Sequence, residues 1–394
     1  MRSGISWKSP ISASWWWCLI ENGTRWAAPM RAKASLRQLR LVDVDVGGDV
    51  HRVVMGGVAP CPGPTVRDSM DYLESRADGL RRLLISEPFG YDSMCVDLVM
   101  PACLPEAQLG YVIMEVMGYP FYSGSNTIAT AAAVLEAGLV PMEEGEQSLC
   151  LEAPAGLTRV RTRNRDGVVE SVTAQGSPAF IQARDESVTV PGLGTVRYDL
   201  AWSGGYYIMV DAASLGHRVA EAEINAMILT ADRIVNAVQR EFRYQHPELG
   251  AVGLPRFLHF MGPVERRADG RLWAASATYG HPGVIWRCPT GTGTSARLAL
   301  MAARGEITPG VPLETVSPAG NAFTGVINGF SSVGGHQAVD TAITARPYPV
   351  ANMDMTIDID APMMRPYQLH HILITPGNAL TAAGRCDQNR RSSS

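Results

Sequence analysis

The sequence has little charge and no block of charge of one sign. Charged residues make up 18% of its 394 residues, below the ~25% usual for globular proteins, and the formal net charge is −4. No cluster of lysine and arginine stands out along the chain. Because nucleic acids and anionic membrane surfaces are bound through such clusters, we expect neither as a partner.

Metal-ligand spacing is also missing. The seven cysteines are scattered without a Cys-x-x-Cys pair, and the eight histidines are dispersed apart from His370-His371. A zinc site is therefore not expected, and the sequence predicts no metal. Scattered thiols fit a reducing compartment, so the predicted location is the cytoplasm.

The chain has no apolar run near the ~20 residues that span a bilayer, so we expect no membrane segment. Its strongest apolar stretch, residues 15–20, stops at Glu21 and lacks a clear small-residue cleavage site for a signal peptide. Residues 1–35 do not read like the rest of the chain. We expect them to be a disordered extension, or residues included because the translation start is assigned too far upstream, and to lie outside the site.

One short pattern occurs twice. Ser123-Gly124-Ser125-Asn126-Thr127 opens a small-residue segment that closes at Gly138, and Thr290-Gly291-Thr292-Gly293-Thr294 opens another that closes at Gly305, 15 residues on in both copies. Each copy predicts a capped helix, since hydroxyl and amide residues favour the N-cap and glycine the C′ position. We expect Ser123 and Thr290 to face each other across a cleft. The two helix N-termini would then offer unpaired N–H groups and partial positive charge to a carboxylate.

The predicted elements repeat in the same order around the two copies. Helical spacing lies at 69–84 and, as the longest amphipathic helix, at 220–242. Strand patterns lie at 41–57 as a hairpin, 94–100, 109–115, 148–152, 157–163, 168–174, 188–200, 204–211, 256–261, 272–277, 283–286, 313–316, 323–327 and 337–345. We therefore expect a first lobe over 36–200 with the half-site 123–138 and a second lobe over 201–345 with the half-site 290–305. Residues 346–394 would be a closing segment and a loose tail.

Three stretches together resemble a known family. They are Ser123-Gly124-Ser125-Asn126-Thr127-Ile128, Leu151-Glu152-Ala153-Pro154-Ala155-Gly156-Leu157 and Thr290-Gly291-Thr292-Gly293-Thr294-Ser295-Ala296-Arg297. The chain resembles the proline racemase family, which includes proline racemases, 4-hydroxyproline 2-epimerases and trans-3-hydroxyproline dehydratases. The resemblance implies an α+β fold of two similar lobes, like diaminopimelate epimerase, each with strands wrapped around a central helix and with the active site between them. It also implies an enzyme without a cofactor that acts at Cα of proline or hydroxyproline.

The resemblance also assigns the site residues. In the family's racemases two cysteines exchange the Cα proton from opposite faces, and Ser123 and Thr290 stand at their positions, which makes these two the implied catalytic residues. Ser125 replaces a histidine and Trp286 an aspartate of the racemase pattern. The implied substrate-binding residues are Gly124, Ser125, Asn126, Trp286, Gly291, Thr292, Gly293 and Tyr207, the last from a Gly-Gly-aromatic strand that also holds Tyr206.

The replaced cysteines leave several reactions open. Threonine at the second position resembles the dehydratases, and dehydration needs only one base because loss of the β-hydroxyl replaces the second proton delivery. We therefore expect trans-3-hydroxy-L-proline dehydratase activity, with 4-hydroxyproline 2-epimerase or proline racemase as alternatives, or a catalytically weak relative that binds an imino acid. Serine at the first position leaves the base unidentified, because an alcohol needs an adjacent base. Cys288 is a candidate, although a buried flanking cysteine is the simpler interpretation. The expected partners are proline or hydroxyproline and, as a possible assembly, a homodimer.

Overall fold

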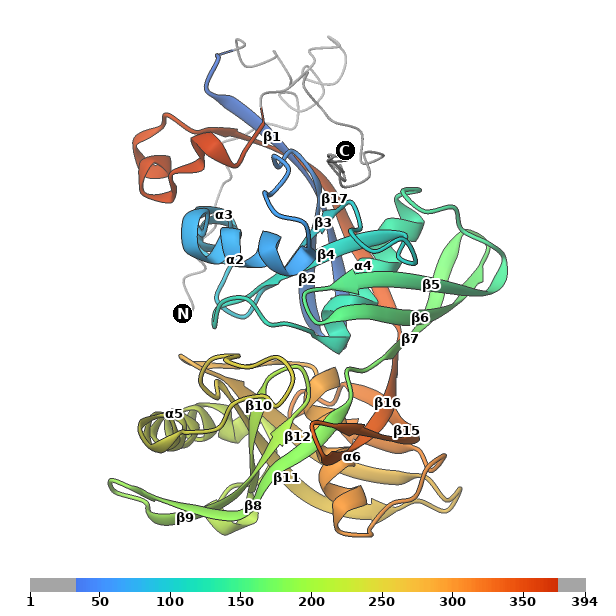
Figure 1. Cartoon of the computed structure of the whole chain (residues 1–394), viewed down its shortest axis with the longest axis vertical. Helices are drawn as coiled ribbons and strands as arrows, with labels where there is room; N and C mark the ends of the chain where they lie inside the picture. Colours follow the sequence, from blue (N-terminus) through green and yellow to red (C-terminus); the bar gives the residue numbers. More distant parts are fainter. Residues whose placement is uncertain (1–32, 375–394) are drawn as a thin grey trace, which may run out of the picture.

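The computed structural model describes residues 33–374, whose strands wrap around two short helices in an upper and a lower group (Figure 1). In these residues the strands form one hydrogen-bonded sheet of 17 strands. We name the upper group the first lobe and the lower group the second lobe. The fold is α+β with few helices, as the sequence analysis expected.

The first lobe surrounds α4 (Gly124–Glu136). Its strands are β1 (Leu36–Val46), β2 (Asp49–Gly56), β3 (Cys95–Met100), β4 (Leu109–Met114), β5 (Gly145–Ala153), β6 (Gly156–Arg165), β7 (Val168–Gln175) and β17 (Pro347–Asp358). The helices α2 (Val66–Arg76) and α3 (Gly79–Leu84) lie outside these strands, together with the 3-10 turns Pro362–Tyr367 and Leu369–His371. The expected helix over 69–84 is thus two helices, separated at Ala77 and Asp78.

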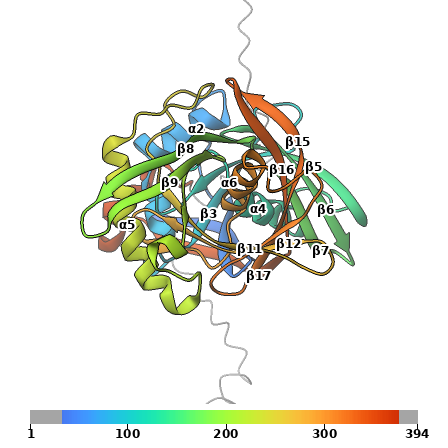
Figure 2. The same ribbon diagram turned by 90° about the horizontal axis from the view of Figure 1, so that it is seen from below.

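The second lobe surrounds α6 (Gly291–Ala303). Its strands are β8 (Ala179–Val190), β9 (Gly194–Trp202), β10 (Tyr206–Asp211), β11 (Phe257–Arg266), β12 (Leu272–Gly280), β13 (Val284–Ile285), β14 (Leu313–Val316), β15 (Ala322–Val333) and β16 (His336–Ala345). The amphipathic helix α5 (Ile224–Glu241) covers the outside, preceded by short 3-10 turns at Ala213–Leu215 and Glu221–Glu223. Seen from below, α4 and α6 lie at the centre of the ring of strands (Figure 2).

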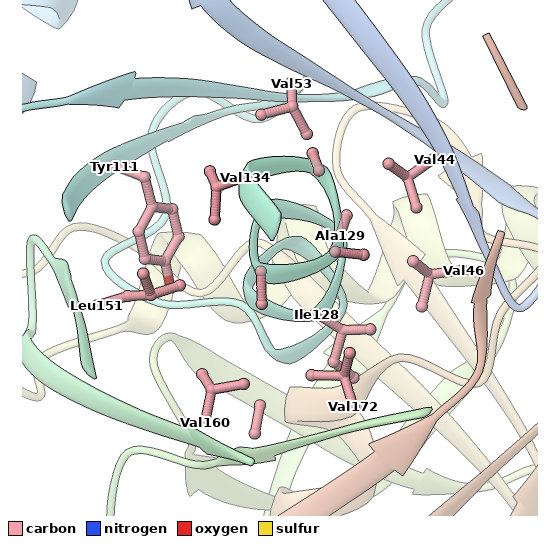
Figure 3. Packing of buried hydrophobic residues seen from close by; sticks show 14 of the residues in the cluster. Val44, Val46, Val53, Tyr111, Ile128, Ala129, Val134, Leu151, Val160 and Val172 are labelled. Carbon is pink, nitrogen blue, oxygen red and sulfur yellow. The ribbon is translucent and has the colours of Figure 1, made fainter. Parts of the chain in front are cut away.

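The small-residue sequence of α4 explains its central place. Every residue from Gly124 to Leu135 is buried, and a helix that is buried on all sides belongs in a core. In Figure 3, Val44 and Val53 approach the helix from one side and Val172 from another, around Ile128 and Ala129. Alanine side chains let the strands come close, so the lobe wraps tightly around this helix.

The helix α6 is buried in the same way but carries a charge inside its lobe. The Arg297 guanidinium donates to the Ala275 carbonyl oxygen (2.9 Å), to Ser276 Oγ (3.0 Å) and to the Gly262 carbonyl oxygen. Burial lowers the pKa of Arg297 to about 10, and these three acceptors compensate for the lost solvation. The contact ties α6 to β12 and to the irregular part of β11, where the register shifts after Met261.

Strand β16 joins the two lobes. Its first half pairs with β8 (Ala338 opposite Phe180) and its second half with β7 (Ala342 opposite Gln175). The chain crosses into the second lobe at residues 176–178 and returns at Arg346. The expected boundary at residue 200 therefore falls inside β9, which pairs with β10 of the second lobe. The single strand expected over 188–200 is two strands in the structure, β8 and β9. The sequence analysis placed it in the first lobe because a strand pattern does not show which sheet the strand joins.

The segment after residue 346 belongs to the first lobe. Residues 347–358 form β17, which pairs with β1 along its length. The sequence analysis did not predict this strand, because few of its side chains are buried and because it contains proline and methionine. Residues 33–35 contact the same region, because Lys33 pairs with Asp358 (3.1 Å) and the Ser35 carbonyl oxygen accepts from the N–H of Ile359 (3.1 Å). The rest of the expected extension, residues 1–32, and the tail from 375 lie outside the described residues.

Candidate active site

The two repeated motifs meet at the N-termini of the central helices. A Cβ built on Gly124 would lie 3.2 Å from the Cα of Gly291, and one built on Gly291 would lie 3.0 Å from the Cα of Gly124. Both positions are glycine because the two backbones touch there. Ser123 and Thr290 are the N-cap residues, and neither side chain makes a capping hydrogen bond. Both hydroxyls are thus left for other partners.

A cavity of about 340 Å³, counting the space open to solvent at its mouth, lies beside this junction. Ser123 and Thr290 line it from opposite lobes. Its lining residues are Cys95, Glu115, Pro120, Tyr122, Ser123, Ser125, Tyr207, Phe257, Trp286, Cys288, Thr290 and Thr292. Six of the residues that the sequence analysis assigned to the site are among them. The other four, Gly124, Asn126, Gly291 and Gly293, shape the junction without lining the cavity.

On the second-lobe side, the Thr290 hydroxyl ends a chain of hydrogen bonds. Thr290 Oγ1 lies 2.8 Å from Thr278 Oγ1, which lies 2.8 Å from His259 Nδ1. Burial, and then the charge of Arg297, lower the pKa of His259 to about 3, so its ring is neutral. A Cβ on Gly293 would approach all three of these polar atoms to less than 3.0 Å. The absence of a side chain at Gly293 therefore leaves room for this chain of hydrogen bonds.

The backbone of Thr290 is strained. Its φ of 61° and ψ of 132° are unusual for a β-branched residue. Ser123 has an ordinary extended conformation, with φ −148° and ψ 129°. Strain of this kind persists where the surroundings fix the residue, and it concentrates at functional sites. Thr294 contributes to that fixing, because its N–H (3.0 Å) and its hydroxyl (2.9 Å) donate to the Thr290 carbonyl oxygen.

The first-lobe side repeats this frame with different side chains. Thr127 donates to the Ser123 carbonyl oxygen from its N–H (3.0 Å) and its hydroxyl (2.7 Å), as Thr294 does for Thr290. Asn126 occupies the place that Gly293 has in the second motif, and its Nδ2 donates to Glu115 Oε1 at 2.6 Å. The two half-sites therefore share a backbone design but place a carboxyl on one side and a hydroxyl–imidazole chain on the other.

Three aromatic rings form one wall of the cavity. Tyr207 stacks on Phe257 with ring centroids 4.6 Å apart and an interplanar angle of 7°, and Phe257 lies 6.1 Å from Trp286. The Tyr207 hydroxyl hydrogen-bonds with Thr292 Oγ1. Tyr206 faces the other side of the strand and packs on Trp202, so Tyr207 is the tyrosine of this pair that lines the cavity. A small apolar ring would pack well against such a wall.

Several acidic groups are buried near the cavity. Burial raises the pKa of Glu115 to about 7 and that of Asp49 to about 6. The Asp49 carboxylate, from β2, accepts from the backbone N–H groups of Arg287 (3.0 Å) and Cys288 (2.7 Å) and so connects the lobes. Burial also raises the pKa of the Cys288 thiol well above its usual value. Cys288, the candidate base from the sequence, lines the cavity but is a neutral thiol at neutral pH.

The third motif of the family resemblance, residues 151–157, lies away from the cavity. Glu152 Oε2 accepts from the backbone N–H groups of Cys103 (2.7 Å) and Leu104 (2.8 Å). The N–H of Ala155 donates to the Phe121 carbonyl oxygen at 3.1 Å. This motif therefore holds the loop before β4 and the segment that leads to Ser123.

Sequence reasoning missed several residues at the cavity: Cys95, Glu115, Pro120, Tyr122 and Phe257, with Thr278 and His259 behind Thr290. Most lie in strands that read as core. Glu115 gave one signal, because a carboxyl that ends an apolar strand just before a motif is unusual unless it has a partner. In residues 33–374, no group of three or more His, Cys, Asp or Glu could hold a metal ion. No helix in the same range is long and apolar enough to cross a membrane.

Known proteins match most of this chain. A family model described as proline racemase matches residues 41–368. A protein from Chromohalobacter salexigens is 51% identical over 345 residues, which cover 88% of this chain and 95% of its own. A protein from Marinobacter nauticus is 51% identical over 335 residues, which cover 85% and 95%.

Two solved structures are also similar. A hydroxyproline epimerase from Agrobacterium vitis with bound trans-4-hydroxy-L-proline is 31% identical with a TM-score of 0.78, and the match covers 83% of this chain and 94% of that one. A probable proline racemase from Agrobacterium radiobacter with bound carbonate has the same identity and TM-score, and the match covers 83% and 95%.

Proposed function

Because this chain belongs to the proline racemase family, we propose that it is a cofactor-independent enzyme that removes the Cα proton of proline or hydroxyproline. One observation carries the proposal: Ser123 and Thr290 line a single cavity beside two abutting helix N-termini. The substrate carboxylate would lie against the N–H groups that begin α4 and α6, where the helix dipoles favour negative charge. The same N–H groups would stabilise the charge that moves onto the carboxylate when Cα loses its proton.

The difference between the two half-sites favours dehydration of trans-3-hydroxy-L-proline. Racemisation needs an equivalent proton carrier on each face of Cα, whereas elimination needs one base and a proton donor for the leaving hydroxyl. The first-lobe side has a carboxyl, that of Glu115, among the groups that line the cavity with Ser123. The second-lobe side has a neutral alcohol, Thr290, hydrogen-bonded to Thr278. In the reaction the Cα–H bond and the Cβ–O bond break, the electron pair forms a carbon–carbon double bond, and water leaves.

Epimerisation of 4-hydroxyproline is the second candidate. The similar Agrobacterium vitis protein is a hydroxyproline epimerase with trans-4-hydroxy-L-proline bound. In that reaction a proton would return to Cα from the opposite face, and Thr290 is the residue of this chain that lies there. The cytoplasm as location and a homodimer as assembly stay proposals as well.

The test is to incubate the protein in D2O with trans-3-hydroxy-L-proline, trans-4-hydroxy-L-proline or L-proline and to follow the Cα proton by NMR. Loss of the Cα signal with a pyrroline product from the 3-hydroxy substrate supports dehydration. Deuterium at Cα of the opposite isomer of the 4-hydroxy substrate supports epimerisation instead, and deuterium in D-proline supports racemisation. Saturable binding without any of these changes contradicts the enzyme proposal and identifies a catalytically weak relative.

A further inference from the structure

Glu115 is the only carboxyl-bearing residue among those that line the cavity in the described chain. It directly follows β4, and its backbone is fixed by two hydrogen bonds with Gly118, at 2.8 Å from its N–H and 3.0 Å to its carbonyl oxygen. Arg81 Nη1 donates to the same carbonyl oxygen at 2.9 Å. Asn126 Nδ2 fixes the carboxyl itself at 2.6 Å. The backbone of Glu115 is therefore fixed by Gly118 and Arg81 and its carboxyl by Asn126, in a cavity that Ser123 and Ser125 also line.

The other groups that line the cavity are poor bases near neutral pH. Burial raises the pKa of the Cys95 and Cys288 thiols well above their usual value. Burial also raises the pKa of Tyr122 and Tyr207. The serine and threonine hydroxyls need a base of their own to remove a proton from carbon. A carboxyl is the one lining group whose ionised form is accessible in this range.

The surroundings of Glu115 bring its pKa close to neutral pH, so that both protonation states are populated there. The groups that face it are Cys95 and Asp97 of β3, Asp49 of β2 and Asn126 of α4, together with Tyr207 of β10 and Cys288 from the second lobe. Burial raises its pKa most, the hydrogen bonds from Asn126 and Cys95 lower it, and the charge of Asp49 raises it, with about 7 as the result. A group with such a pKa can both take and release a proton, which is what a general base at neutral pH must do.

We propose that Glu115 is the catalytic base on the face of the cavity that carries Ser123. The inference rests on the proposed function and supplies the proton acceptor that the replacement of the family's cysteine leaves open. The Glu115 carboxylate forms an O–H bond with the Cα proton, and the C–H electron pair moves toward the substrate carboxylate. In dehydration that pair then forms the Cα–Cβ double bond as the Cβ–O bond breaks, and the leaving hydroxyl takes a proton from solvent to become water. Glu115 afterwards releases its proton to solvent at the mouth of the cavity, so no oxidant or reductant is needed.

The test uses two substitutions of one residue and a matched control. Glu115→Gln keeps the shape and an oxygen for Asn126 but cannot accept a proton, whereas Glu115→Asp keeps the carboxyl. The control is Glu152→Gln, the same substitution at a buried carboxyl of β5 that does not line the cavity and that keeps an acceptor oxygen for the N–H groups of Cys103 and Leu104. For each variant, Cα exchange in D2O, substrate binding by calorimetry and the pH profile of kcat are measured.

We expect Glu115→Gln to slow Cα exchange at least ~100-fold while substrate still binds, because a general base contributes about that much or more. We also expect it to lose the rise of kcat near pH 7. Glu115→Asp should keep that rise at a lower rate, and Glu152→Gln should stay close to the wild type. A Glu115→Gln protein with near wild-type exchange, or an equal loss in Glu152→Gln, would overturn the inference.

If Glu115→Gln does not fold, the pH dependence of the wild-type kcat tests the inference instead. A kcat that is flat between about pH 6 and about pH 8 overturns Glu115 as the base. If the wild type exchanges no Cα proton with any of the three substrates, the proposed function fails separately. Calorimetry of L-proline binding, in buffers of different ionisation heat, then tests Glu115 separately. Proton uptake or release on binding that is lost in Glu115→Gln identifies Glu115 as the titrating group. Uptake or release that persists in Glu115→Gln overturns that assignment.

Discussion

Gly124 and Gly291 bring the N-termini of α4 and α6 into backbone contact, although 167 residues separate them in the sequence. This contact fixes the distance between the lobes at the point where the substrate carboxylate would lie. A side chain at either position would push the two helices apart. The two glycines therefore set the geometry of the cavity rather than supply its chemistry.

We expect Gly124→Ala to reduce activity strongly and to destabilise the fold by about 1–3 kcal/mol, since its methyl group would lie 3.2 Å from the Cα of Gly291. The matched control is Gly329→Ala in β15, where a Cβ has nothing within 4 Å and φ is not positive. Steady-state kinetics and chemical denaturation measure both effects. Full activity of Gly124→Ala would show that catalysis does not require the close contact between the two helix N-termini.

A second prediction concerns the hydroxyl chain. Thr278→Val removes the middle hydroxyl and leaves Thr290 Oγ1 and His259 Nδ1 without their partner, so we expect a loss of about 1–3 kcal/mol in stability and a large drop in kcat. Thr341→Val is the control, because Thr341 is equally buried and hydrogen-bonds with Ser295 Oγ (2.7 Å), and neither residue lines the cavity. It should lose comparable stability but keep its kcat. Equal losses of kcat in both variants would show that the hydrogen bonds of Thr278 contribute to stability and not specifically to catalysis.

The sequence predicted the central part of this architecture well. The repeated motif placed both central helices and both N-caps correctly, since capping residues and small-residue helices are local signals. The family resemblance named Tyr207 and Trp286, and both line the cavity. The strand expected over 188–200 covered parts of both β8 and β9, and β17 was not predicted, because the choice of a partner strand depends on packing across the molecule. Glu115 and His259 were missed for the same reason: their neighbours come from strands distant in the sequence.

The third prediction concerns Cys288. The substitution Cys288→Ser should leave activity within about threefold of the wild type, because burial keeps the thiol protonated and a thiol acts as a base only when ionised. The backbone N–H that donates to Asp49 remains in the variant, so the connection between the lobes is kept. Cα exchange and substrate binding are compared at neutral pH. Lost exchange with binding retained would identify Cys288, and not a carboxyl, as the base.

The last prediction concerns stability and pH, and it does not depend on catalysis. Folding raises the pKa of Glu115 from 4.5 to about 7, so the folded protein binds this proton more tightly than the unfolded chain. The stabilisation is present below pH 4.5 and is lost as pH rises through about 7. At ~1.36 kcal/mol per pKa unit, Glu115 should lower the free energy of unfolding by about 3 kcal/mol over that range.

The comparison is between the wild type and Glu115→Gln, whose side chain stays neutral throughout. Asp49 acts in the same direction, from 3.8 to about 6, and remains in both proteins. Denaturant unfolding at intervals from about pH 5 to about pH 8 should therefore give a steeper fall for the wild type than for the variant below about pH 7, and a constant separation of the two curves above it. Parallel curves would mean that Glu115 ionises in the folded protein as easily as in the unfolded chain. Its burial would then have no effect on its proton affinity.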